Sequence, residues 1–405
     1  MLRLTGAAAG LSVLGNCTGR TEKTATPERT TPPTPTPTPA GERGYLIFLT
    51  TKDGVKVLDQ DARVVVPATS VATSTPDWRH VVTASADGTG THVVVRDLAS
   101  GQVLSGTTLR GRLAPRIVSA NGPLVASVPP GGAGIYGLHD PQGRERTTVV
   151  VSQPGGERVR LDLPGNIEPE AFSPDGNYLH VLDYVPAARP ERYLPRVVDL
   201  RTRQMDAVLT RELPTGATEE MHAHRIERIV DPRREMLFTL CSHEGDAIAF
   251  VHCLDLRQRW AQRIALPAPF GQGRPGVHGI ALSPSGDRLA VVHSLSARAV
   301  DIDPDHLAVK RAYSFAATRQ DGKPGVLITP SGSLVVSVDR LVIVAGRRQI
   351  PTQGQTRGLA LGTANDIWAG HPDGLAQYSL TTGKELRRIA VPNLYVLKHV
   401  HPKPT

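Results

Sequence analysis

One short motif, a Ser-Pro turn followed by an apolar strand, recurs along most of this chain. "SPDGNYLHVLDY" begins at Ser173, "SPSGDRLAVVHS" at Ser283 and "TPSGSLVVSV" at Thr329, while "TPDWRHVVTA" from Thr75 and "DPRREMLFTL" from Asp231 are diverged copies. Ser, Pro, Asp and Gly in this order are the residues that a type I turn prefers. The motif therefore predicts many short strands joined by tight turns.

The segments around each turn repeat as well. A short apolar segment such as "HGIAL" precedes the turn, and the strand behind it is followed by a third, such as "ARAVDID", and a more polar fourth, such as "LAVKRAYSF". Four strands repeating at roughly 45–58 residues are typical of one blade of an antiparallel β-propeller. We therefore expect an all-β fold, a single closed propeller of four-stranded blades.

The number of blades follows from counting the second strand of each unit. These strands are expected to begin near Tyr45, His80, Leu124, Tyr178, Met236, Arg288, Ser333 and Asp366. Eight blades are predicted, or seven if the short seventh unit is an insertion.

The two ends of the repeat region complement each other. The first unit lacks an inner strand, and the last is followed by a spare one, "NLYVLKHVHP". Pairing of the spare strand with "YLIFLT" would close the ring and leave no open sheet edge. The predicted propeller spans residues 44–401, and residues 402–405 form a tail.

The N-terminal region has the pattern of an exported protein. Residues 1–17 contain an apolar run too short to span a bilayer, which is typical of a signal peptide. "VLGNC" resembles a bacterial lipobox, which implies lipidation of Cys17, although Asn16 departs from that pattern. Residues 18–43 are rich in Thr and Pro and predict a disordered, extended tether. Ordinary export without an anchor, or no export, is the alternative.

Three units resemble the YVTN-type repeats of bacterial surface propellers, among which are lactonase-like proteins: "VVVRDLASGQVL", "RVVDLRTRQMDAVL" and "YSLTTGKELRRI". The resemblance implies a propeller fold and no particular activity. The N-terminal pattern described above implies a bacterial cell-surface or periplasmic location. The last unit is also similar to quinoprotein blades, but Leu386 and Arg387 stand where those blades carry a Trp. We therefore expect no quinone, and no other cofactor.

The charge pattern argues against a nucleic-acid partner. The net charge is +8, but the 46 basic residues are spread along the chain, which is typical of a solvated surface. The membrane is expected to be contacted through the lipid anchor only, and the protein is expected to be a monomer.

Cys241 and Cys253 flank a predicted hairpin turn. If the hairpin is centred near Ala247, the two residues oppose each other at a distance that suits a disulfide. Two buried thiols, or a metal held by Cys241, His243 and Cys253, are the alternatives.

Charged and imidazole side chains occur where the inner strands of the predicted blades begin. Such groups line the channel mouth of a propeller, where they could bind an anion or a metal, or remain ordinary hydrated loop residues. No catalytic motif is recognisable. A binding scaffold for a small ligand or protein is therefore the first hypothesis, and a lactonase-like hydrolase or lyase the alternative. The candidate ligand-binding residues are Glu168, Glu170, His222, His224, Arg225, His278, Lys323 and Arg357.

Overall fold

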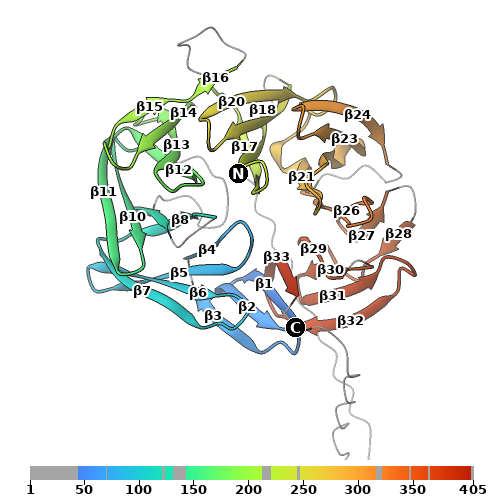
Figure 1. Ribbon diagram of the computed structural model, residues 1–405. Coiled ribbons are helices and arrows are strands. Elements are labelled where there is room, and N and C mark those ends of the chain that lie inside the picture. Colours follow the sequence, from blue (N-terminus) through green and yellow to red (C-terminus); the bar gives the residue numbers. More distant parts are fainter. Residues whose placement is uncertain are drawn as a thin grey trace, which may run out of the picture. The chain divides into compact units, whose positions relative to one another are not determined.

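The computed structural model shows a β-propeller of eight blades arranged in a ring (Figure 1). It describes residues 44–402 except 70, 121–123, 131–142, 212–219, 244–246, 316–321, 346–347 and 364. The predicted fold class is confirmed, with eight blades rather than seven. Residues 1–43, which include Cys17 and the predicted tether, lie outside the described residues, as does the end of the predicted tail.

The chain enters the ring in blade 1, which combines strands from both ends of the propeller, and the next three blades follow in sequence order. Blade 1 contains β33 (Leu394–Pro402), β1 (Tyr45–Thr51), β2 (Gly54–Asp59) and β3 (Val64–Thr69); blade 2 contains β4 (Val71–Ser74), β5 (His80–Asp87), β6 (Gly90–Asp97) and β7 (Val103–Arg110); blade 3 contains β8 (Ala114–Val118), β9 (Val125–Val128), β10 (Arg146–Gln153) and β11 (Gly156–Pro164); blade 4 contains β12 (Asn166–Phe172), β13 (Tyr178–Val185), β14 (Arg192–Asp199) and β15 (Met205–Ala207).

The second half has the same order, with one extra short strand, β16, pairing in parallel with the outer strand of blade 5. Blade 5 contains β16 (Leu209–Thr210), β17 (His224–Asp231), β18 (Met236–His243), β19 (Ile248–Asp255) and β20 (Trp260–Ala265); blade 6 contains β21 (His278–Leu282), β22 (Leu289–His293), β23 (Arg298–Asp303) and β24 (Ala308–Ser314); blade 7 contains β25 (Gly325–Ile328), β26 (Leu334–Val338), β27 (Leu341–Val344) and β28 (Arg348–Pro351); blade 8 contains β29 (Leu359–Leu361), β30 (Asp366–His371), β31 (Gly374–Ser379) and β32 (Glu385–Ala390).

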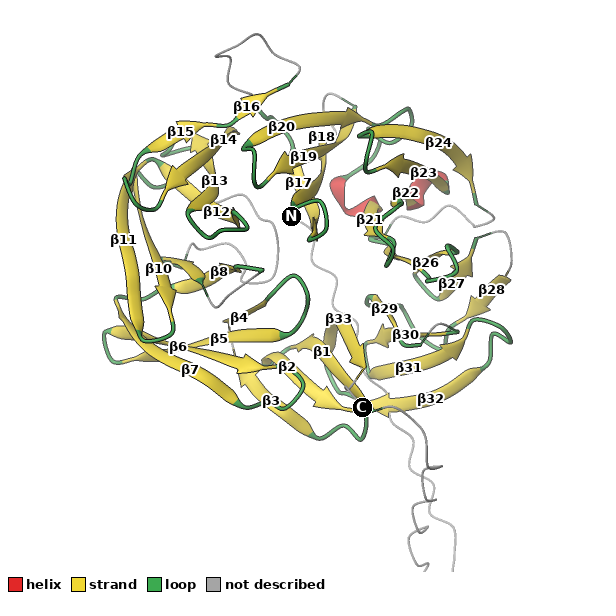
Figure 2. Ribbon diagram, in the orientation of Figure 1, coloured by secondary structure: helices red, strands yellow, loops and turns green. Residues whose placement is uncertain are grey.

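Helix is almost absent from the described part of the chain. Two 3-10 turns, η1 (Pro275–Val277) and η2 (Ser294–Ser296), lie beside blade 6 (Figure 2). None of the described helices is long and apolar enough to cross a membrane.

The Ser-Pro turns join the first and second strands of a blade, as their composition predicts. At Ser173, the amide of Gly176 donates to the Ser173 carbonyl (2.9 Å), and the Ser173 hydroxyl donates to Asp175 while accepting from the Tyr178 amide. Gly176 has a φ of +67°, a conformation that glycine adopts without strain. The repeated residues therefore recur because each turn reuses the same hydrogen bonds.

The ring closes through the pairing predicted from the two chain ends. β1 and β33 are antiparallel, with Tyr45 opposite Pro402 and Phe48 opposite His399. The imidazole of His399 stacks on the indole of Trp78 in blade 2, with ring centroids 4.3 Å apart. Because the last strand of the chain completes the first blade, the two ends of the propeller hold each other in place.

Apolar side chains fill the space between neighbouring blades. Between blades 5 and 6, for example, Phe238, Val251 and Ile280 belong to one buried cluster. The interface of blades 4 and 5 instead contains two separate clusters, one around Leu237 and one around Tyr193. Polar side chains occupy the region between these two clusters, which is described below.

The predicted disulfide between Cys241 and Cys253 is wrong, since both sulfurs are buried thiols. The hairpin is centred further toward the N-terminus than expected, so Cys241 pairs with Phe250 and Cys253 pairs with Phe238. Because side chains alternate between the two faces of a strand, this register places the two cysteines on opposite faces of the sheet. The same geometry excludes a metal held jointly by Cys241, His243 and Cys253.

Candidate functional site

The structure does not gather the eight predicted ligand-binding residues into one site. Three of them lie between blades: Glu170, Arg225 and His278. Two lie at the rim of blade 5, namely His222 and His224, and three lie on the inner side of the ring, namely Glu168, Lys323 and Arg357.

Glu170 and Arg225 form a buried ion pair between blades 4 and 5. Their side chains are 3% and 5% exposed, and Arg228 approaches the same carboxylate at 3.6 Å. Burial disfavours the cation, but the surrounding groups, Glu170 first among them, together outweigh this effect and raise the pKa of Arg225 above its ordinary value. The adjoining cavity measures about 10 Å³, which is room for about one water molecule. This pair therefore joins two blades and has no space for a ligand.

His278 also has a structural setting. It is fully buried at the interface of blades 5 and 6, and its two ring nitrogens face the carbonyls of Pro275 and Phe270. Its ring packs against that of His293, with centroids 4.7 Å apart. Burial lowers the pKa of His278 below its ordinary value, which favours the neutral ring, and in this form one of the two nitrogens donates to its carbonyl. The imidazole thus fixes the loop before blade 6.

His222 and His224 lie at the rim of blade 5 beside a third imidazole, that of His243. The ring of His243 is 4.3 Å from that of His222 and 6.4 Å from that of His224, measured between centroids. The three side chains contribute to a pocket of about 70 Å³ that also includes Glu191 and Arg192. Within the described ranges, no three histidine, cysteine or carboxylate side chains are arranged to hold a metal ion.

Arg357 lies just before the inner strand of blade 8 and helps to position the closing strand. Its guanidinium donates to the carbonyl of Leu394, and its own carbonyl accepts from the amide of Leu397 at 2.7 Å. Both partners belong to β33. The side chain of Arg357 is therefore engaged in ring closure.

Lys323 belongs to a group of charged side chains on the inner side of the ring. Lys323 precedes β25 in blade 7, and its ammonium lies 3.8 Å from the carboxylate of Glu227 in blade 5. Blade 6 separates these two blades in the ring (Figure 1), so the pair reaches across its inner side. Lys398, on β33 of blade 1, interacts electrostatically with both residues. We call Glu227, Lys323 and Lys398 the axial cluster.

A second charged group lies where blades 3 and 4 meet on the inner side. Arg116 on β8 pairs with Glu168 on β12 at 3.2 Å. Arg144 donates from Nε to the side-chain oxygen of Asn166 at 3.0 Å. Its guanidinium also interacts electrostatically with the Glu168 carboxylate and the Arg116 cation. We call Arg116, Arg144 and Glu168 the wall cluster.

Sequence analysis found Glu168 and Lys323 but missed the other members of the two clusters. Arg116 precedes the sequence "SANG" instead of a Ser-Pro turn, and Lys398 lies in the last strand, which no such turn follows. Glu227 lies in the segment before the diverged turn at Asp231, where no sequence signal separates it from the neighbouring charged residues.

Comparison with known proteins supports the fold alone. No model of a known protein family matches the sequence, and no curated protein matches it. Among solved structures, apo AztD from Citrobacter koseri superposes with a TM-score of 0.55 at 11% identity, over 89% of this chain and 98% of that chain. A candidate 6-phosphogluconolactonase from Bacteroides uniformis gives a TM-score of 0.46 at 15% identity, over 89% and 98% of the two chains. At such identities the shared feature is the propeller architecture.

Proposed function

We propose that this protein is an exported, lipid-anchored propeller that binds a small ligand at the ring axis without transforming it. The observation that carries the proposal is the convergence of charged side chains from blades 1, 5 and 7 in the axial cluster. Glu227 and Lys323 are 39% and 57% exposed, so solvent reaches the cluster. Solvated polar groups that converge from separate elements are a common basis for ligand recognition.

Export and anchoring rest on the N-terminal sequence. The apolar run ending at Cys17 and the Thr/Pro-rich residues 18–43 suit a lipidated cysteine followed by a tether. In the native host, Cys17→Ala should move the protein from the membrane fraction to the soluble fraction with its melting temperature unchanged. Equal membrane retention of wild type and variant would refute the anchor.

The binding function can be tested by obstructing the axis. A metabolite library that includes lactones and esters is tested with the full-length protein for thermal stabilisation and for hydrolysis. We expect ligands that raise the melting temperature without being consumed, and we expect Lys398→Trp to abolish their effect because a bulky neutral indole replaces an ammonium of the axial cluster. Lys323→Trp is the second obstruction if the first variant misfolds. Hydrolysis that both variants abolish would instead establish the lactonase-like alternative.

A further inference from the structure

The two inner clusters share one imbalance of charge. The axial cluster contains two cations, Lys323 and Lys398, and one carboxylate, Glu227. The wall cluster likewise contains two arginines and one carboxylate. Each cluster therefore carries an excess positive charge on the inner side of the ring.

In the axial cluster, the charge of Lys398 is less compensated than that of Lys323, which pairs with Glu227. It is exposed and forms no ion pair with any residue in the described part of the chain. Partial desolvation, together with repulsion from Lys323, lowers the pKa of Lys398 below its ordinary value, although Glu227 opposes the shift. The ammonium is thus repelled by a neighbouring cation, and the carboxylate that opposes this repulsion, Glu227, is already paired with Lys323.

Arg144 in the wall cluster is in a similar position. Its guanidinium donates to a neutral amide oxygen, that of Asn166. Burial and the repulsion of Arg116 lower the pKa of Arg144 below its ordinary value, while Glu168 opposes the shift. Here too the carboxylate already has a closer cationic partner, Arg116 at 3.2 Å.

We propose that the ligand at the ring axis is a small anion, bearing carboxylate or phosphate groups, and that Lys398 and Lys323 are its principal contacts. The inference rests on the proposed binding function and names the ligand class. An anion would neutralise the excess charge and accept charged hydrogen bonds from both ammonium groups, which are stronger than neutral ones. Protein walls around a site of one sign also concentrate counter-ions there.

The alternative of a cationic ligand fits the same residues poorly. Glu227 is the one carboxylate of the axial cluster, and it is already paired with Lys323. A cation would have to displace that pairing and lie beside Lys398. Like charges brought close together at a partly desolvated site repel each other strongly.

The test is calorimetric titration of the full-length protein with citrate and, separately, with inorganic phosphate. We expect one or both to bind, and Lys398→Met to weaken that binding about ten-fold or more, since a charged hydrogen bond is lost. Lys398→Arg should retain binding within a few-fold. The matched control is Lys52→Met, which removes an exposed lysine from the turn between β1 and β2. Lys323→Met gives a second reading if Lys398→Met is poorly folded.

Each outcome has a definite meaning. Equal affinity for wild type, Lys398→Met and Lys323→Met would overturn the assignment, as would loss of binding in Arg144→Met with Lys398→Met unaffected. If neither anion binds but uncharged library ligands do, and Lys398→Trp abolishes their effect, the ligand class is wrong and the binding function stands. If nothing binds to the wild type, both proposals fail.

Discussion

The Glu170–Arg225 pair and the Glu227–Lys323 pair each join a carboxylate of one blade to a cation of another, but their surroundings are opposite. The first pair is buried between adjacent blades, with side chains 3% and 5% exposed. The second reaches past an intervening blade at the ring axis, with side chains 39% and 57% exposed. Sequence alone presents all four as charged residues near the beginnings of inner strands.

The difference indicates which charges hold the fold and which remain available. Removing one partner of a buried pair leaves the other charge without water or a counter-ion, which is strongly destabilising. An exposed pair exchanges easily with water and contributes little to stability. The interface between blades 4 and 5 therefore depends on its charges, whereas the axial cluster can change partners and accept a ligand.

The largest effect is expected from breaking the buried pair. Glu170→Ala leaves the Arg225 guanidinium buried between two blades without its counter-ion and should lower the free energy of unfolding by about 3–5 kcal/mol. Urea denaturation measures this loss of stability. The double variant Glu170→Met with Arg225→Met, which removes both charges, should recover much of the loss. A loss below about 1 kcal/mol in the single variant would mean that the pair is not structural.

The same interface should be sensitive to acid. His180 on β13 is fully buried, its Nε2 faces the carbonyl of Leu256 in blade 5, and burial lowers its pKa to about 4. Because the unfolded chain takes up this proton near pH 6.5 and the folded chain does not, stability is fully present above that pH. It should then fall by about 3 kcal/mol as the pH drops toward 4.

Urea denaturation of wild type and His180→Gln across pH 7 to 4 isolates this contribution, because other buried histidines remain in both proteins. The variant should have the shallower pH dependence over this range. Parallel curves for the two proteins would show that His180 does not contribute.

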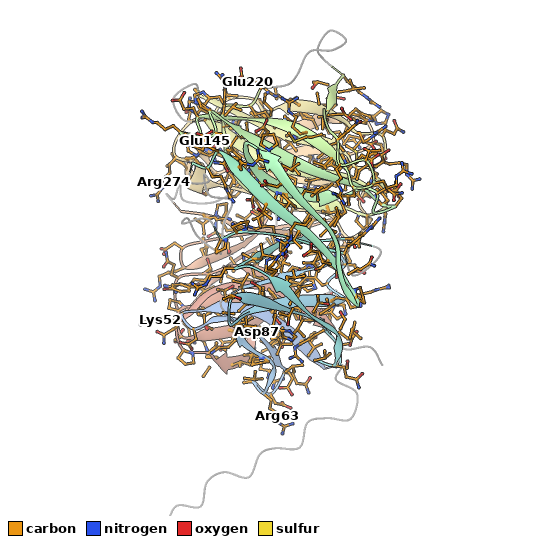
Figure 3. The ribbon with its side chains drawn as sticks, turned by 90° about the vertical axis from the view of Figure 1, so that its left-hand side faces the viewer. Lys52, Arg63, Asp87, Glu145, Glu220 and Arg274 are labelled. Carbon is orange, nitrogen blue, oxygen red and sulfur yellow. The ribbon has the colours of Figure 1, made fainter. Side chains whose placement is uncertain are left out.

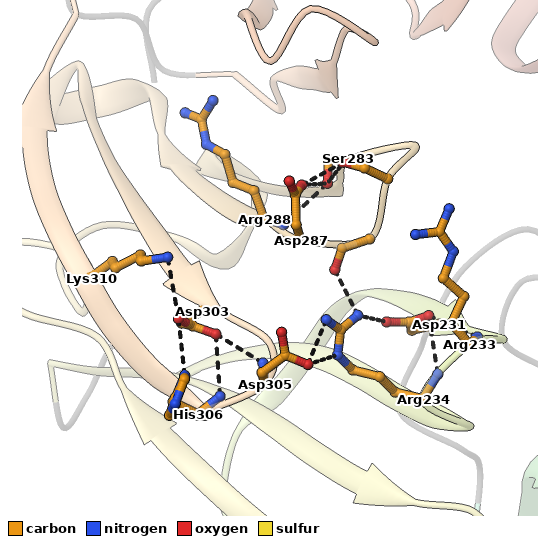
Figure 4. Close-up of polar contacts among 12 residues, drawn as sticks. Asp231, Arg233, Arg234, Ser283, Asp287, Arg288, Asp303, Asp305, His306 and Lys310 are labelled. Carbon is orange, nitrogen blue, oxygen red and sulfur yellow. Dashed lines mark hydrogen bonds and ion pairs between the residues drawn. The ribbon is translucent and has the colours of Figure 1, made fainter.

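A smaller loss of stability is expected at a partly buried group of charged hydrogen bonds between blades 5 and 6, which we call the clamp. Arg234 is 20% exposed and bonds Asp231, Asp305 and the carbonyl of Gly286 (Figure 4). Arg234→Ala should cost about 1–3 kcal/mol, as is typical of charged hydrogen bonds.

The comparison for the clamp is a surface arginine. Arg146 pairs with Asp162 while more than half exposed, so Arg146→Ala should cost less than about 1 kcal/mol. Charged side chains of this kind extend over the outer surface in Figure 3, where Lys52, Arg63 and Arg274 project away from the blades. Equal losses for the two variants in urea denaturation would show that burial does not rank these pairs.

The smallest effect on stability should come from Glu227→Gln in the axial cluster. The pair it breaks is exposed, so the free energy of unfolding should change by less than about 1 kcal/mol. Removal of the carboxylate should, however, strengthen citrate binding, because it leaves Lys323 and Lys398 less compensated. Calorimetric titration measures this gain, and weaker binding in the variant would contradict the assignment.

The repeat made the fold predictable in detail. The second strands begin at Tyr45, His80, Val125, Tyr178, Met236, Leu289, Leu334 and Asp366, each within one residue of its expected start. The turn residues define where each hairpin begins, and the apolar alternation defines which side of a strand is buried. The surplus strand at the end was sufficient to predict its pairing with β1.

The site was less predictable, because it depends on which blades face one another across the ring. No local pattern separates Arg225, which points between blades, from Glu227, which lies two residues later beyond a β-bulge at Ile226. The bulge changes which side of β17 the following side chains point to, only two residues after the strand begins. The cysteine pairing failed for a related reason, since the centre of a hairpin depends on loop residues whose composition allows several registers.

The most direct test of this account measures stability and binding together in two variants, Glu170→Ala and Lys398→Met. We expect Glu170→Ala to lose several kcal/mol of unfolding free energy and yet, while folded, to bind citrate or phosphate as wild type does. We expect Lys398→Met to keep the wild-type stability and to lose most of its affinity for the anion. The opposite pattern, with Lys398→Met unfolding easily or folded Glu170→Ala unable to bind, would contradict the division between structural and ligand-binding charges.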